Sequence, residues 1–272
     1  LFFLLFFCYI IIIGDGMTGR IKGESESVRK TFKFIDDSKK EDIDEYVLTC
    51  LSHDYHRFSS PIEVGMYLSG PGYLTYDEVS YIREYSGYNF KHLNQALRGK
   101  WNYEENGDYS RFDKFLNNAT KIKKIIEKHP TTGENFTVYR GVNLHYFKDY
   151  GISSIEDLTC MEGKFLLDRG FVSTSVLEKN CFYKKENDLG FDFNIKIEYL
   201  INEDFRDGMY IGNNSNLSYS PDQYEFLINA HNIAKVAKVT IGDDNTAKLT
   251  AVMIPKSIYD DYYKKSSANA KK

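Results

Sequence analysis

The stretch Arg169-Gly170-Phe171-Val172-Ser173-Thr174-Ser175 decides how the rest of the chain is interpreted. Its aromatic and β-branched residues predict a strand that carries a cluster of hydroxyl groups. Two segments of similar character accompany it, Tyr139-Arg140-Gly141 earlier in the chain and Gln223-Tyr224-Glu225 later. Each segment means little alone. Together they place a cation, hydroxyl groups and a carboxylate with an amide partner on strands, a set that could hold and cleave a dinucleotide.

The composition is that of an ordinary globular protein with one large domain or two small ones. The 272 residues are 42% apolar and 27% charged. A net charge of −4 argues against a surface that grips nucleic acid throughout, because phosphate binding needs clustered Lys and Arg. The four Cys have no metal-like spacing, and His53 with His56 is the only close pair among six His. We therefore expect no metal.

The first 13 residues form an extreme apolar run. This run is short for a bilayer span, and its length suits the apolar core of a secretory signal. We expect residues 1–16 to be a signal-like or anchor segment and residues 17–27 to be a polar linker. The prediction is a secreted protein without stable membrane association after processing. The alternatives are a membrane-anchored surface protein, or upstream sequence that is not translated, with Met17 as the start.

Helical patterns fill the chain from about residue 31 to residue 129. Apolar residues recur near helical period in residues 41–53 and 89–98. Thr75 followed by Glu78 is a capping-box signature and predicts a helix to about residue 85. Residues 109–128 predict a long amphipathic helix that stops before Pro130.

The pattern changes after Pro130 to short strands separated by turn residues. The predicted strands cover residues 136–139, 171–172, 193–200, 209–211, 225–228, 233–241 and 247–254. Helices followed by strands indicate an α+β fold rather than a doubly wound parallel sheet. No P-loop and no Gly-x-Gly-x-x-Gly is present, which argues against a Rossmann site.

NAD is a dinucleotide whose chemistry would suit these strand residues. Its nicotinamide–ribose bond breaks through an oxocarbenium-like state, which a carboxylate can stabilise through the ribose hydroxyl. Glu225 is the candidate carboxylate, and Ser173 would hydrogen-bond and orient it. Arg140 could grip a diphosphate or ribose hydroxyl through its planar guanidinium. A serine nucleophile is not expected, since there is no Gly-x-Ser-x-Gly elbow.

Gln223 lies two residues before Glu225, so the two side chains would share one face of an extended segment. A carboxylate at position 223 could pair with an arginine acceptor. The neutral amide suits hydrogen bonding to another amide or to a base edge. The residue therefore indicates that the acceptor is not Arg.

The order and spacing of these motifs resemble those of the mono-ADP-ribosyltransferase exotoxins, in the branch with Gln at the first acidic-motif position. The resemblance covers about residues 25–255. It implies N-terminal helices packed on two antiparallel β-sheets that form an NAD-binding cleft. Residues 28–258 would then be one domain, helical over about 28–130 and a β-sandwich over about 134–256, followed by a polar tail over 259–272.

The resemblance also implies roles for particular residues. Asn94 and Arg98, in Asn94-Gln95-Ala96-Leu97-Arg98-Gly99, look like the family's helical Asn-x-x-Leu-Arg element, whose Arg helps to bind the NAD phosphates. The implied catalytic residues are Glu225, Gln223, Ser173 and Arg140. The implied cofactor-binding residues are Asn94, Arg98, Arg140, Gly141, Ser173, Thr174, Phe182 and Lys185. Tyr219 would recognise the target protein.

The function implied by the resemblance is transfer of ADP-ribose from NAD to a protein side chain, Asn or Gln rather than Arg. The pattern is similar to the clostridial-type Rho-modifying exoenzymes and to the enzymatic components of binary actin-modifying toxins. The implied partner is therefore a host small GTPase, modified inside a target cell. Three alternatives stay open: an NAD glycohydrolase, a guanine-modifying enzyme of the same fold, and a non-catalytic partner-binding module.

Overall fold

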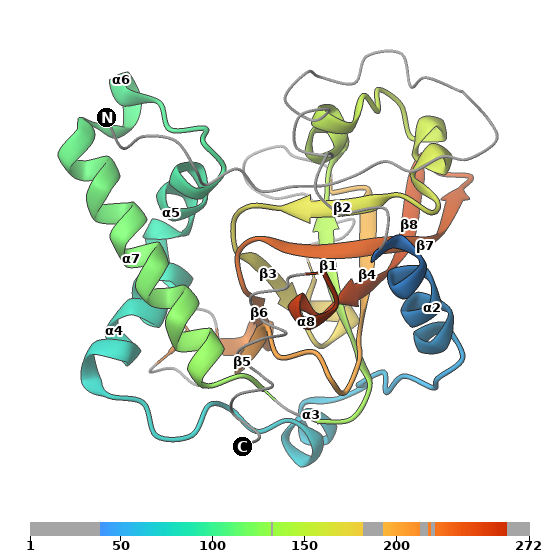
Figure 1. The fold of residues 1–272 in the computed structure, drawn as a ribbon, viewed down its shortest axis with the longest axis horizontal. Helices are drawn as coiled ribbons and strands as arrows, with labels where there is room; N and C mark the ends of the chain where they lie inside the picture. The colour runs from blue at the N-terminus through green and yellow to red at the C-terminus, as the bar shows by residue number, and fades with distance from the viewer. Residues whose placement is uncertain (1–38, 132, 182–192, 213–216, 219–220, 260–272) are drawn as a thin grey trace.

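The computed structural model describes residues 39–131, 133–181, 193–212, 217–218 and 221–259, and it shows helices followed by strands (Figure 1). The α-helices are α2 (Lys40–Leu51), α3 (Pro61–Tyr67), α4 (Tyr76–Glu84), α5 (Phe90–Leu97), α6 (Tyr103–Asn106), α7 (Tyr109–Lys128) and α8 (Lys256–Tyr259). The strands are β1 (Phe136–Val142), β2 (Phe165–Asp168), β3 (Val172–Ser175), β4 (Ile195–Ile201), β5 (Gly208–Gly212), β6 (Glu225–Ile228), β7 (Asn232–Gly242) and β8 (Thr246–Ile254). A π-helical turn, η2 (Tyr85–Asn89), joins α4 to α5, and 3₁₀ turns lie at η3 (Leu144–Tyr150), η4 (Glu156–Met161), η5 (Glu178–Asn180) and η6 (Pro221–Gln223).

The predicted α+β class is confirmed, and two helix boundaries follow from local signals. Thr75 accepts a hydrogen bond from the Glu78 backbone at 3.3 Å, and the Glu78 carboxylate accepts one from the Thr75 backbone at 2.8 Å. This is the complete capping box that opens α4. Helix α7 has the predicted bounds, starts after an Asp108 cap and ends before Pro130.

The strands form one continuous sheet in the order β2-β7-β8-β4-β1-β3-β6-β5, rather than the two expected sheets. The two parts meet at a single residue pair, Tyr139 in β1 with Ser175 in β3, and β4 pairs with β8 in parallel. Because this junction is so narrow, the β3-β6-β5 part can turn against the larger part. The largest apolar core lies between the two parts and includes Phe136 and Phe226, whose rings meet edge to face at 5.3 Å.

Two further apolar cores attach helices to the outer sides of the sheet. One packs α4, α5 and α7 against β5 and β6, with Ile122 and Leu227 fully buried. The other packs α2 against the β2, β4, β7 and β8 region through Ile43 and Val47. Figure 1 shows these two helical groups on opposite sides of the strands. The helical group α4–α7 therefore stands beside the short β3-β6-β5 part.

Besides the four-residue helices α6 and α8, the sequence prediction omitted strand β2 and helix α3. Each is short, at 4 and 7 residues, so neither offers enough residues for a clear period. Their ends are nevertheless well defined: Ser60 caps α3 through the Glu63 backbone, and β2 pairs with β7 along its length. The predicted signal-like segment, the linker and residues 260–272 of the predicted tail lie outside the described residues.

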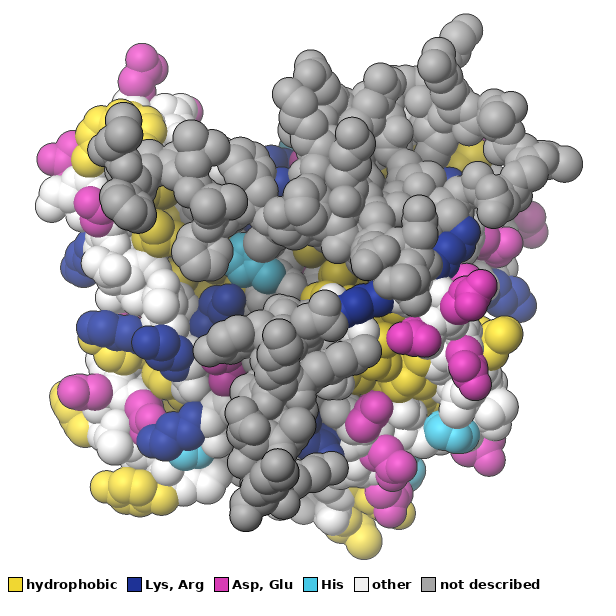
Figure 2. All heavy atoms as spheres, viewed as in Figure 1, with side chains coloured by type: hydrophobic (Ala, Val, Ile, Leu, Met, Phe, Trp, Pro, Cys, Tyr) yellow, Lys and Arg dark blue, Asp and Glu magenta, His cyan; other side chains and the backbone are white. Residues whose placement is uncertain are grey.

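The surface charge is divided unevenly between the two helical groups. On the face in Figure 2, Asp and Glu side chains gather around α2, which carries Glu41, Asp42, Asp44 and Glu45, whereas a band of Lys and Arg crosses α7. The net charge of −4 therefore conceals regions of opposite sign. Among the described helices, none is both long and apolar enough to cross a membrane.

We expect Thr75→Ala to lower the free energy of unfolding by about 1 kcal/mol, because it leaves the first turn of α4 without its side-chain cap. Urea denaturation would measure the change. Ser80→Ala is the matched control, since Ser80 is exposed within the same helix and should change stability by less than about 0.5 kcal/mol. Equal effects of the two substitutions would contradict the role given to the cap.

Candidate active site

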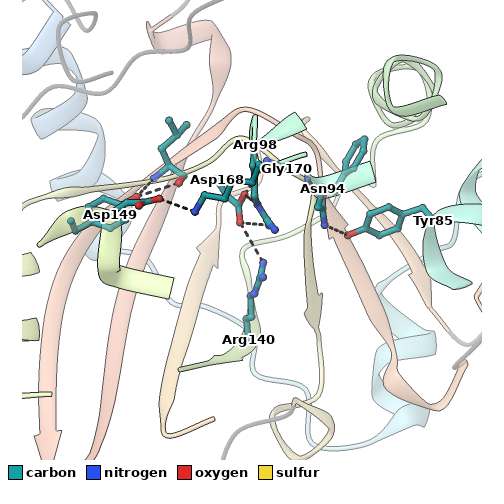
Figure 3. A network of polar contacts seen from close by, with 11 residues as sticks. Tyr85, Asn94, Arg98, Arg140, Asp149, Asp168 and Gly170 are labelled. Atoms are coloured by element: carbon teal, nitrogen blue, oxygen red, sulfur yellow. Dashed lines mark hydrogen bonds and ion pairs between the residues drawn. The ribbon is translucent and has the colours of Figure 1, made fainter. Parts of the chain in front are cut away.

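A buried ion pair lies where helix α5 approaches the end of strand β2 (Figure 3). Arg98, the residue that follows α5, donates from Nε to Asp168 Oδ1 and from Nη2 to Asp168 Oδ2, both at 2.8 Å. The Asp168 side chain is only 5% exposed. The two parallel hydrogen bonds fix the plane of the guanidinium, which a single contact would not do.

Asn94, one turn before Arg98 on α5, connects the helix to the loop that precedes β3. Its Oδ1 accepts a hydrogen bond from the Phe171 backbone at 2.8 Å. A side chain at Gly170 would not fit here, because a Cβ atom would lie 2.5 Å from Asn94 Oδ1. On its other side, Asn94 Nδ2 donates to the Tyr85 hydroxyl at 3.5 Å. Asn94 thus holds the start of β3 against the helical group.

Arg140 enters the same cluster from strand β1 (Figure 3). Its Nη1 atom lies 3.8 Å from Asp168 Oδ2, and its guanidinium carbon lies 5.4 Å from the centre of the Tyr146 ring. The Nη1 atom is buried and has no hydrogen-bond partner among the described residues. A buried guanidinium nitrogen without an acceptor is costly, so this atom is suited to an anionic ligand.

Glu225, the first residue of β6, is the buried acid of the site at 5% exposure. Burial raises the pKa of this carboxyl from 4.5 to about 7, and a hydrogen bond from Ser173 partly opposes the rise. The Tyr85 hydroxyl is close enough to Glu225, Arg140 and Arg98 to interact electrostatically with all of them. Tyr85 is therefore a common neighbour of the carboxylate and the two cations.

The turn before Glu225 differs from the extended segment that the sequence predicted. Gln223 ends the 3₁₀ turn η6, and Tyr224 has a φ of +51°, in the left-handed region. The Ser175 hydroxyl donates to the Gln223 carbonyl at 2.7 Å, which anchors the turn to β3. The expectation that Gln223 and Glu225 share one face of a strand was therefore wrong. The side chain of Gln223 is partly exposed and hydrogen-bonds no described residue.

The predicted site residues fall into three groups. Asn94, Arg98 and Arg140 belong to the network in Figure 3, and Glu225, with Ser173 as its hydrogen-bond partner, neighbours the Tyr85 hydroxyl. Gly141 pairs with Lys196 inside the β1–β4 ladder, and the Thr174 hydroxyl donates to the Phe226 carbonyl at 2.6 Å, so that hydroxyl ties β3 to β6. Phe182, Lys185 and Tyr219 lie outside the described residues.

The sequence interpretation missed Asp168, Tyr85 and Tyr146. The only signal for Asp168 was an acidic residue two positions before the Gly that opens the predicted strand. Tyr85 lies nine residues before Asn94 and within a π-helical turn, which no local pattern announced. Among the described residues, no group of three or more His, Cys, Asp or Glu side chains could hold a metal ion.

Comparison with known proteins identifies the class of protein that this fold and site define. The family model for the ADP-ribosyltransferase exoenzymes matches residues 51–256, and the chain belongs to this family. Family membership makes NAD the expected co-substrate, in agreement with the sequence-based prediction. Among curated protein sequences, none matches the chain.

Solved structures support the same fold. The C3stau2 structure from S. aureus, described with NAD, has a TM-score of 0.57 at 18% identity and covers 75% of this chain and 100% of its own. The Clostridium limosum C3 exoenzyme has a TM-score of 0.58 at 16% identity, with coverages of 75% and 98%. Plx2a, an ADP-ribosyltransferase toxin from Paenibacillus larvae, has a TM-score of 0.51 at 23% identity, with coverages of 66% and 87%. These similarities confirm the resemblance on which the sequence analysis relied.

The burial of Glu225 predicts a measurable cost to stability. Because its pKa in the folded state is raised, the folded chain holds this proton more tightly than the unfolded chain between pH 4.5 and about 7. Stability should fall as pH rises through this window. We therefore expect Glu225→Gln to raise the free energy of unfolding by on the order of 2–3 kcal/mol at pH 8, with the gain disappearing toward pH 4.5.

Denaturant unfolding at a series of pH values would measure this dependence. Glu203→Gln is the matched control, because Glu203 is exposed and should leave the pH dependence unchanged. A gain for Glu225→Gln that is the same at pH 4.5 and pH 8 would contradict the assignment of a buried, ionisable Glu225.

Proposed function

We propose that the chain is a mono-ADP-ribosyltransferase that cleaves the nicotinamide–ribose bond of NAD and transfers ADP-ribose to a protein side chain. The observation that carries the proposal is a buried carboxylate, Glu225, that shares the Tyr85 hydroxyl as a neighbour with Arg98 and Arg140. Family membership and the solved C3stau2 structure described with NAD support NAD as the co-substrate. The proposed setting is that of a secreted toxin that acts inside a target cell.

The described residues fit the negatively charged part of NAD. Arg98 and Arg140 bring two positive charges together, and the buried Nη1 atom of Arg140 lacks an acceptor. Diphosphate oxygens supply acceptors of the required charge and geometry. We assign the diphosphate to these two guanidinium groups and assign the nicotinamide ribose to the side of the site that contains Glu225.

Glu225 would contribute electrostatically to bond cleavage. As the nicotinamide leaves, positive charge grows on the ribose, and an ionised carboxylate that accepts a bond from a ribose hydroxyl stabilises that charge. The low-dielectric surroundings that raise its pKa also strengthen this interaction. Ser173 would favour the ionised form and hold it in position through its hydrogen bond.

Gln223 is the proposed contact for the acceptor. Its amide lies just before Glu225 in the turn and is partly exposed. An amide can both donate to and accept from another amide, which favours Asn or Gln as the acceptor over Arg. A Rho-type GTPase is the acceptor protein that we propose to test first. Hydrolysis of NAD in the absence of an acceptor is the rival activity.

We expect Glu225→Gln to lower the rate of nicotinamide release from NAD by 100-fold or more, because it removes the negative charge that faces the ribose. Gln223→Ala should abolish labelling of proteins in a eukaryotic cell lysate but keep NAD hydrolysis within about threefold of the wild type. Release of labelled nicotinamide and a gel of lysate incubated with labelled NAD would measure the two activities.

The outcomes separate the rival functions. Release that depends on Glu225 without any labelled protein would indicate a glycohydrolase or a non-protein acceptor, which a parallel incubation with DNA would distinguish. No release and no labelling by the wild type would reject the enzyme and favour a partner-binding module. Equal loss of both activities in Gln223→Ala would show that Gln223 serves NAD rather than the acceptor.

The pH dependence of NAD cleavage gives an independent test. Because the ionised form of Glu225 is required, kcat/KM should increase as pH rises through about 7 and then level off. Ser173→Ala should move this rise to higher pH, since the Ser173 hydrogen bond lowers the pKa of Glu225. A profile that does not move, or that moves to lower pH, would contradict the assigned hydrogen bond.

A further inference from the structure

Asp168 is held rigidly by its own surroundings. Its Oδ1 atom accepts a hydrogen bond from the Gly170 backbone at 2.9 Å, and its carbonyl accepts one from the His231 backbone at 3.2 Å. The residue also pairs with Asn232 in the β2–β7 ladder. With its side chain 5% exposed, Asp168 presents a carboxylate whose position is set by the sheet.

This fixed carboxylate determines how Arg98 is presented. A guanidinium carries five N–H groups in one plane, and two of those on Arg98 are taken by Asp168. Three N–H groups of Arg98 remain beyond these two hydrogen bonds, and the side chain as a whole is 29% exposed. Without Asp168, the long side chain would have to lose rotamer freedom when a ligand binds.

The same carboxylate lies beside Arg140 without taking its hydrogen bonds. The distance of 3.8 Å from Asp168 Oδ2 to Arg140 Nη1 allows electrostatic attraction but is too long for a hydrogen bond. Asp168 therefore offsets the repulsion between two neighbouring guanidinium groups. Two cations and one anion leave a local excess of one positive charge, together with the unpaired Nη1 atom of Arg140.

We propose that Asp168 is a positioning residue that aligns Arg98 and Arg140 for the diphosphate of NAD. The inference rests on the proposed function, because it requires NAD to bind at these arginines. Arg98 follows helix α5, Arg140 lies on β1 and Asp168 ends β2, so the carboxylate joins three separate elements (Figure 3). Asp168 itself does not contact the reacting bond.

A nearby exposed ion pair provides the matched control. Lys100 contacts Asp149 at 2.9 Å and also links the end of α5 to the sheet side, through η3. These side chains are 60% and 53% exposed, so the Asp149 carboxylate is not held in a buried position as Asp168 is. Asp149→Asn therefore removes an ion pair from the same region without disturbing Arg98 or Arg140.

The decisive experiment measures NAD binding by calorimetry in the Glu225→Gln background, where turnover is suppressed, together with steady-state kinetics on chains that keep Glu225. Asp168→Asn should raise the Kd and the KM for NAD tenfold or more while kcat changes less than threefold. Asp168→Glu, which keeps the charge, should recover part of the affinity. Asp149→Asn should leave both constants within twofold.

Two results would overturn the inference. Unchanged NAD affinity in a less stable Asp168→Asn chain would make the ion pair a contributor to folding only. Tighter binding would make Asp168 a competitor of the diphosphate. If Asp168→Asn does not fold, Arg98→Lys replaces it, because Lys keeps the charge but loses the planar fork, and an unchanged KM would then reject the proposal. Absence of both NAD binding and nicotinamide release in the parent chains would reject the proposed function and this inference together.

Discussion

The packing of the short β3-β6-β5 part of the sheet against the larger part is the constraint on which the site depends. Phe226 must enter the core between the two parts, where it meets Phe136. Glu225 precedes Phe226 directly in β6, so burying the aromatic ring in this core places the carboxylate on the opposite face of the strand, where Leu227 packs in the core of the helical group. Burial on that face raises the pKa of Glu225, so the ionisation of the carboxyl is tied to the position that the packing of Phe226 gives to β6.

The helical group α4–α7 contributes the remaining residues of the site. Asn94 accepts from the Phe171 backbone and Arg98 pairs with Asp168, so α5 is joined to the loop between β2 and β3 at two places. The close approach at Gly170 allows these contacts. The site therefore lies at the meeting of the helical group with both parts of the sheet, and its charged groups come from each of them.

Sequence patterns were sufficient to predict helices and strands whose bounds are set by neighbouring residues. The bounds of α7, the capping box at Thr75 and strand β6 follow from period, caps and β-branched runs. That a single pair between Tyr139 and Ser175 joins the two packed parts into one sheet could not be predicted, because this contact is between residues that are distant in the sequence. The positive φ of Tyr224 could not be anticipated either, since nothing marks a non-glycine residue for that conformation.

The candidate site shows the same division between local and long-range causes. Glu225, Ser173, Arg140, Asn94 and Arg98 could be proposed from the sequence because each lies in a short motif of recognisable composition. Asp168 and Tyr85 were missed because their importance comes from contacts with residues that are distant in the sequence or on another element. The hydrogen bonds between Arg98 and Asp168, for example, span 70 positions. A single sequence without a known fold contains no signal for such a pair.

The distribution of the charged groups over separate elements has a consequence for folding. Arg98 reaches Asp168 only when α5 is docked, whereas Arg140 and Asp168 belong to the sheet. A folding intermediate with a formed sheet and an undocked helical group would therefore hold only half of the cationic pair. Recovery of nucleotide affinity during refolding would report the arrival of the helices, separately from spectroscopic signals that report the strands.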